Sequence, residues 1–169
     1  KSKPESELYN LKASAFEAFK KNQVMDSKDV RMKIENYGSY LDLYYGFYDL
    51  GANLFNNKKY SEAFDAFKKS LEVGDYILTK KYTYPQATLY ALDTALVLNT
   101  AIAATQAKKE DESIAYYRKI TDANVSGEGY KEVYEYLVEY YNKKENKTEL
   151  DQILAKAKKF YPTNNYWNQ

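Results

Sequence analysis

The sequence predicts an all-α protein built as a stack of antiparallel helix pairs. Apolar residues recur at the spacing of helix faces, polar breaks separate segments of about one helix length, and small residues fall where two helices would cross. A chain of 169 residues can bury roughly two thirds of its unfolded surface, which is enough for a core without metal or disulfide support. We therefore expect one domain that spans residues 1–169.

The clearest helix pair lies in residues 44–73. Its first helix has an apolar face at the i, i+3, i+4 and i+7 positions: Phe47, Leu50, Gly51 and Leu54. After a polar break at residues 56–59, a second face follows: Ala63, Phe67 and Leu71. Gly51 and Ala63 have almost no side chain, so the two backbones can approach closely while aromatic rings fill the space around them.

This stretch resembles the tetratricopeptide repeat (TPR), whose unit carries an aromatic residue, then Leu-Gly, then an aromatic residue or Leu, and then Ala-x3-Phe at these intervals. The resemblance implies a bacterial TPR-like helical repeat protein. Its fold would be a right-handed α-α superhelix, a TPR-like solenoid of about four antiparallel helix pairs. It also implies a protein that binds a partner rather than one that carries out chemistry.

The remaining elements follow from helix spacing and from residues that end helices. Four helix pairs are predicted at residues 4–37, 40–73, 85–121 and 128–161, with a linker or lid at 74–84 and a tail at 162–169. In the first pair, Leu8 and Leu11 begin the apolar face of a long helix. Val30 and Ile34 face inward from a shorter second helix, which Gly38 ends.

The linker or lid predicted at residues 74–84 separates the second pair from the third. The helical period fails in this segment, which Gly74 opens. The Tyr84-Pro85 step disfavours helix before the proline. A connection of this length favours mobility.

Composition argues against several classes of function. The 25 basic and 24 acidic residues are interspersed and leave a formal charge of +1, so no basic field is available to bind nucleic acid. Cysteine and histidine are both absent, which removes thiol and imidazole nucleophiles, zinc sites and disulfides. No apolar run reaches the roughly 20 residues of a membrane span. We therefore expect no enzymatic activity, no cofactor and no metal.

The resemblance implies that a ligand binds in a concave groove lined by the first helix of each pair. Carried over to this chain, the groove positions are Tyr45, Tyr48, Asp49, Phe55, Asn99, Glu135, Tyr136 and Glu139. Aromatic and acidic side chains dominate this set, so the groove suits a peptide with apolar and basic residues, or a sugar stacked on rings. For any single Tyr, the commoner role is to fill a gap between helices with its hydroxyl in water.

The acidic residues of this set allow two other interpretations. Glu128, Glu132, Glu135 and Glu139 share one helix face, as an acid/base pair or a cation site would require, but a solvated charge stripe is far commoner. Some TPR domains bind the C-terminal carboxylate of chaperones through Lys, Arg and Asn on these faces. Here the glutamates would repel a carboxylate, so we reject that activity.

We expect a non-enzymatic scaffold or adaptor that binds a protein or peptide partner. The alternative is a carbohydrate-binding helical scaffold of an exported bacterial protein, which coplanar exposed rings near one Asp or Asn would favour. Self-association, oligomeric state and compartment are left open. The absence of cysteine and a first residue other than Met favour an exported, periplasmic protein over a cytoplasmic one.

Overall fold

The computed structural model describes residues 4–26, 28 and 30–168. Over these residues the chain is all-helical and has no strand, which confirms the predicted all-α class. The α-helices are α1 (Glu5–Met25), α2 (Val30–Ile34), α3 (Gly38–Asn56), α4 (Tyr60–Lys80), α5 (Thr94–Gln106), α6 (Glu110–Asp122), α7 (Lys131–Lys143) and α8 (Lys147–Phe160). Two short 3-10 helices, η1 (Glu128–Tyr130) and η2 (Asn165–Asn168), accompany the last two α-helices.

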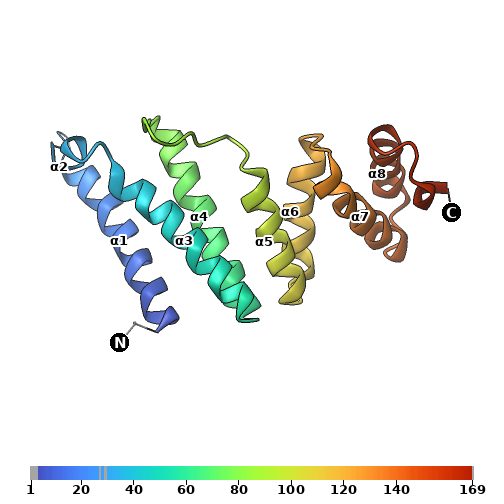
Figure 1. Ribbon diagram of the computed structural model, residues 1–169, viewed down its shortest axis with the longest axis horizontal. Coiled ribbons are helices and arrows are strands. Elements are labelled where there is room, and N and C mark those ends of the chain that lie inside the picture. Colours follow the sequence, from blue (N-terminus) through green and yellow to red (C-terminus); the bar gives the residue numbers. More distant parts are fainter. Residues whose placement is uncertain (1–3, 27, 29, 169) are drawn as a thin grey trace.

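Apart from the short α2, which lies by the end of α1, the helices follow one another in chain order along the long axis of the molecule (Figure 1). α3 packs against α4, α5 against α6, and α7 against α8, while contacts of α4 with α5 and of α6 with α7 join these pairs. Each pair therefore touches mainly its neighbours in the sequence.

None of the described helices combines the length and the apolar character that crossing a bilayer would need.

The three pairs are closed by the same backbone turn. One residue in the left-handed region follows each first helix: Lys58 (φ 61°), Lys108 (φ 60°) and Glu145 (φ 53°). The next amide donates to the carbonyl five residues earlier: Lys59 to Leu54 at 2.9 Å, Lys109 to Ala104 at 2.9 Å, and Asn146 to Tyr141 at 3.0 Å. These bonds satisfy carbonyls that a helix end leaves open, and they fix the direction in which the second helix starts.

The predicted first helix pair at residues 4–37 is wrong. α2 has only five residues, and Val30 and Ile34 do not face inward: both are exposed, Ile34 by 81%. α1 packs instead against α3 and α4, where Phe16 is buried. Helical spacing alone could not reveal this arrangement, because α1 carries apolar residues on more than one face.

The direction of α1 shows which place it takes in the stack. It begins near the start of α4, where Glu5 pairs with Lys59 at 2.5 Å. Further along both helices, Lys20 lies 3.7 Å from Glu72. α1 therefore runs parallel to α4 and antiparallel to α3, and it lies beside α3 as α4 lies beside α5 (Figure 1).

The predicted linker or lid at residues 74–84 is also wrong, because α4 continues through Gly74 to Lys80. A Cβ atom on Gly74 would lie 3.1 Å from Cε2 of Tyr44. The glycine therefore allows α4 to pack closely on the Tyr44 ring of α3 and does not end the helix. The sequence alone does not distinguish these two uses of a glycine.

The irregular connection lies at residues 81–93, between α4 and α5, and it is packed rather than open. The Tyr82 ring stacks on Tyr37 with centroids 3.8 Å apart. Tyr84 is buried, and its hydroxyl donates to the Tyr37 carbonyl at 3.1 Å. These contacts hold the connection over the ends of α1 and α3, so it lacks the features of a mobile lid.

The buried side chains form two cores that meet at α5. The first core lies among α1, α3 and α4 and includes Leu96 and Ala104 of α5. The second lies among α6, α7 and α8 and includes Val97 and Ala101 of α5. Trp167 belongs to the second core and is only 4% exposed, so the segment after α8 covers the end of the stack.

Candidate ligand-binding groove

A cavity of about 210 Å³ lies between α3 and α5, and we call it the α3/α5 groove. Its lining consists of Ala52, Phe55, Asn56, Phe67, Asn99 and Ile102. α3 contributes the first three of these residues and α5 the last two, while α4 contributes the buried ring of Phe67. The walls of the groove are apolar and its rim carries two amide side chains.

The structure brings together three of the predicted site residues at this groove. Phe55 and Asn99 line it directly. Tyr48 lies beside it, because its hydroxyl is 3.5 Å from Nδ2 of Asn99 and its ring contacts Phe67 with centroids 5.8 Å apart. Within the described part of the chain, the Asn99 side chain makes this one long hydrogen bond. Its amide therefore keeps most of its hydrogen-bonding capacity for a ligand.

Two other predicted residues of α3 lie outside the cavity. Tyr45 is exposed, and its ring meets the Tyr44 ring edge-on at 5.1 Å. Asp49 is exposed on the same helix and does not line the groove. Both can meet a ligand only where it extends beyond the cavity.

The predicted residues of α7 belong to a separate surface. Tyr136 packs on Tyr117 of α6 with ring centroids 4.9 Å apart. Glu135 accepts a hydrogen bond from Nδ2 of Asn164 at 2.9 Å. Burial raises the pKa of Tyr166, and the carboxylates of Glu139 and Glu135 raise it further. The segment after α8 thus lies near these glutamates, and they do not continue the α3/α5 groove.

Four lining residues lie outside the predicted set of eight: Ala52, Asn56, Phe67 and Ile102. The sequence placed Asn56 in the polar break between two helices and Phe67 on the apolar face of the second helix. Asn56 is instead the last residue of α3, whereas Phe67 is buried on α4 as expected, with its ring against Gly51. The size of Phe67 is the signal that could have identified it. An aromatic ring is large enough to contact a neighbouring helix and still line a cavity beside that helix.

The groove offers recognition chemistry rather than reaction chemistry. The described residues that line it include no ionisable side chain, so they provide neither a nucleophile nor a general base. Across the described residues, no cluster of three or more His, Cys, Asp or Glu side chains is placed to hold a metal ion. Apolar walls with amide groups at the rim suit a peptide ligand. Its apolar side chain would enter the cavity, and the amides would hydrogen-bond to its backbone.

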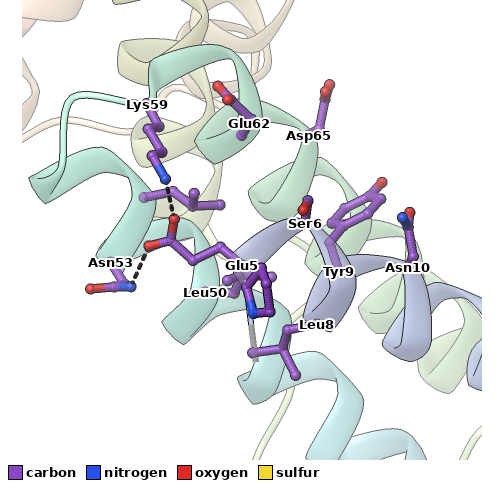
Figure 2. A pocket seen from close by; sticks show the side chains of 12 residues that line it. Glu5, Ser6, Leu8, Tyr9, Asn10, Leu50, Asn53, Lys59, Glu62 and Asp65 are labelled. Carbon is purple, nitrogen blue, oxygen red and sulfur yellow. Dashed lines mark hydrogen bonds and ion pairs between the residues drawn. The ribbon is translucent and has the colours of Figure 1, made fainter. Parts of the chain in front are cut away.

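A larger cavity, of about 780 Å³, lies where α1 begins, and we call it the N-terminal pocket. Figure 2 shows Glu5 at its centre, between Lys59 and Asn53. Glu5 accepts hydrogen bonds from Lys59 at 2.5 Å, Asn53 at 3.0 Å and Asn57 at 3.3 Å. The Lys59 hydrogen bond holds the pKa of the Glu5 carboxyl below its usual value.

The N-terminal pocket is the weaker candidate despite its volume. The polar groups at its centre already satisfy one another, so a ligand would have to compete with the Glu5–Lys59 pair. Sequence reasoning gave no sign of this pocket, because Glu5 and Lys59 are 54 positions apart. Its role in the fold is clear, since this pair attaches the start of α1 to the turn between α3 and α4.

Comparisons of the chain with protein-family models, curated proteins and solved structures give no match. The groove is therefore interpreted from its own geometry.

Proposed function

We propose that the chain is a non-enzymatic scaffold of the TPR type that binds an extended peptide in the α3/α5 groove. The observation that carries this proposal is the convergence of Tyr48, Phe55 and Asn99 on one apolar cavity with free amide capacity at its rim. An apolar peptide side chain would fill the cavity, and Asn99 would bond to the peptide backbone. Aromatic walls of this kind dominate binding energy because they bury large areas.

Two features support the TPR part of the proposal. The same left-handed turn closes all three helix pairs, with matching hydrogen bonds. In the first of these pairs, a Cβ atom on Gly51 would lie 2.6 Å from Cδ1 of Phe67, so the Leu-Gly position of the repeat meets the Phe of Ala-x3-Phe without room for a side chain. Repeated pairs of this kind stack into solenoids whose concave face binds extended ligands.

The rings around the groove favour a peptide over a sugar. Tyr48 and Phe67 meet at an interplanar angle of 57°, and Phe55 and Tyr60 meet at 65°. A sugar ring stacks on a flat platform, which rings at such angles do not form. The stacked pair Tyr37 and Tyr82 packs within the fold near the ends of α1 and α3, away from the groove.

The charges near the groove select among peptides. Asp49 is exposed on α3, three positions, or about one turn, before the groove residue Ala52. None of the described residues that line the cavity is basic. A ligand with an apolar anchor and a neighbouring Lys or Arg is therefore favoured over an acidic one.

The test is a screen of random peptides, displayed in extended form, against the wild-type chain. The best peptide is then titrated against Phe55→Ala and Asn99→Ala, with Tyr90→Ala as the matched control because Tyr90 is 68% exposed and lies outside the groove. Loss of an aromatic anchor should weaken binding about tenfold or more, while the control should bind as wild type. Circular dichroism checks that each variant is folded.

Two outcomes would contradict the proposal. A selected peptide that bound Phe55→Ala as tightly as the wild type would place binding outside the α3/α5 groove. A glycan array that returned tight ligands, when the peptide screen returned none, would replace the peptide with a sugar.

A further inference from the structure

α1 carries an apolar stripe next to the side that packs on the fold. Its core-facing side bears Phe16 and Tyr9, which contact rings of α3 and α4. The stripe follows the i, i+3, i+7, i+10 spacing of a helix–helix seam: Leu8, Leu11, Ala15 and Ala18. Leu8 is 36% and Leu11 is 46% exposed. In the described part of the chain, α1 packs substantially only against α3 and α4. Ala15 is partly buried against their core, and no described helix covers Leu8, Leu11 or Ala18.

A polar edge runs along one side of the stripe. Glu7, Ser14 and Lys21 follow one another at seven-residue intervals, and all three are exposed. A seven-residue interval returns to nearly the same side of a helix after two turns, so these residues line one edge. The edge therefore has a negative end, a small centre and a positive end.

We propose that this face joins two copies of the chain, with α1 of one copy packed antiparallel on α1 of the other about a two-fold axis. In this arrangement the large residues at one end of the stripe meet the small residues at the other. Leu8 faces Ala18, and Leu11 faces Ala15, each pair occurring twice. A stripe with large residues at one end and small ones at the other is self-complementary only in the antiparallel sense.

The charged edge selects the same arrangement. In an antiparallel pair, equivalent edges of the two helices meet, so Glu7 of one copy lies near Lys21 of the other and Ser14 lies near Ser14. A parallel pair would instead bring this edge against the opposite edge of the partner helix, so Glu7 and Lys21 would not meet. Size and charge, which are independent properties of the sequence, thus favour the same geometry.

The opposite edge of the stripe does not oppose this pairing. Its basic residue is Lys12, and the Lys12 ammonium lies directly against Gly46 of α3. Two copies of Lys12 are therefore directed toward their own α3 and away from each other. Gly46 makes this possible because it has no side chain to displace the ammonium.

The seam is narrow, since it consists of one helix from each copy. An interface of this extent lies below the area of permanent dimers, so the association should depend on concentration in the ordinary working range. Sedimentation equilibrium over a wide range of concentrations measures it. The average mass of the wild type should rise from 19.7 kDa toward twice that value as concentration increases.

Charge exchange provides the decisive comparison. Glu7→Lys and Lys21→Glu, each alone, turn two attractive pairs into two repulsive ones and should weaken dimerisation about tenfold. The double variant Glu7→Lys with Lys21→Glu restores opposite charges and should dimerise as the wild type. Glu112→Lys is the matched control, because Glu112 is exposed on α6 and the charge change is the same.

Each of the remaining outcomes would overturn the proposal. A wild type that stays at the mass of one chain at every concentration excludes the dimer. A dimer that neither single exchange weakens uses another surface. A double variant as weak as the single ones excludes the antiparallel pairing of Glu7 with Lys21.

Discussion

The hydroxyl of Tyr44 on α3 donates a hydrogen bond to the Asp93 carboxylate at 2.5 Å, across 49 positions of sequence. The other oxygen of the same carboxylate accepts from the Leu96 amide at 2.9 Å and caps the start of α5. Asp93 thereby anchors the end of the connection at residues 81–93 to α3. Burial and the neighbouring Asp93 raise the pKa of Tyr44 above its usual value.

Replacing Asp93 with Ala removes both interactions. We expect the free energy of unfolding to fall by about 2 kcal/mol, because loss of an N-cap costs about 1 kcal/mol and a hydrogen bond to a charged group contributes at least as much. Tyr44→Phe removes only the second interaction and should cost about half as much. Urea unfolding of the three proteins measures the difference, and equal losses for the two variants would show that the cap contributes nothing.

Amide exchange in the same variants also tests whether the connection at residues 81–93 is anchored. Exchange of its amides should become faster in Asp93→Ala, and by a larger factor than exchange of the amides of α7 and α8, which lie in the other core.

The contact between Gly51 and Phe67 predicts whether replacing this glycine with Ala raises or lowers the stability of the fold. Replacing a glycine inside a helix with Ala ordinarily stabilises a protein by about 0.5 to 1 kcal/mol. At Gly51 the added Cβ would lie 2.6 Å from the Phe67 ring, so we expect Gly51→Ala to destabilise the fold by about 1 to 3 kcal/mol. Gly38→Ala is the control, because no atom lies within 4 Å of a Cβ there, and it should be neutral or stabilising. Thermal unfolding in which both variants gained stability would contradict the close contact.

Alkaline pH should weaken the fold through buried tyrosines. Burial raises the pKa of Tyr84 and of Tyr134 to about 12, from an ordinary value of 10.0. Between these two values the unfolded chain loses phenolic protons that the folded chain retains, so stability falls as pH rises from about 10 to about 12. Below about pH 10 these groups are protonated in both states and have no effect.

Urea unfolding at a series of pH values measures this loss. The hydroxyl of Tyr134 donates to the Val125 carbonyl at 2.7 Å, so Tyr134→Phe should be less stable at neutral pH and should lose less stability above pH 10. A wild-type midpoint that stayed constant from pH 9 to pH 12 would be inconsistent with the raised pKa values.

The sequence was most informative where structure is local. The helix pair predicted at residues 40–73 begins within two residues of the observed start of α3 at Gly38, because the apolar face and the polar break that define it both lie in that stretch. The predictions for residues 4–37 and 74–84 were wrong because they depended on partners distant in sequence. α1 could not be placed on α3 and α4 from its own spacing, and Gly74 could not be matched to Tyr44.

The candidate groove was predicted in part for the same reason. Tyr48 and Phe55 share one side of α3, and the repeat pattern placed Asn99 at the corresponding side of α5. The pattern could not indicate that the predicted α7 residues would contact Asn164 and Tyr117 instead. The segment after α8 has no repeat counterpart, so its position near Glu135 had no signal in the sequence.

α5 has consequences for how the molecule comes apart. Its 13 residues contribute Leu96 and Ala104 to one core and Val97 and Ala101 to the other. A stack of helix pairs ordinarily unravels in steps, one unit at a time, because each unit contacts only its neighbours. Here, loss of α5 removes side chains from both cores at once, so unfolding that starts at either end is transmitted across the middle of the chain. The two halves should therefore melt as a single cooperative transition.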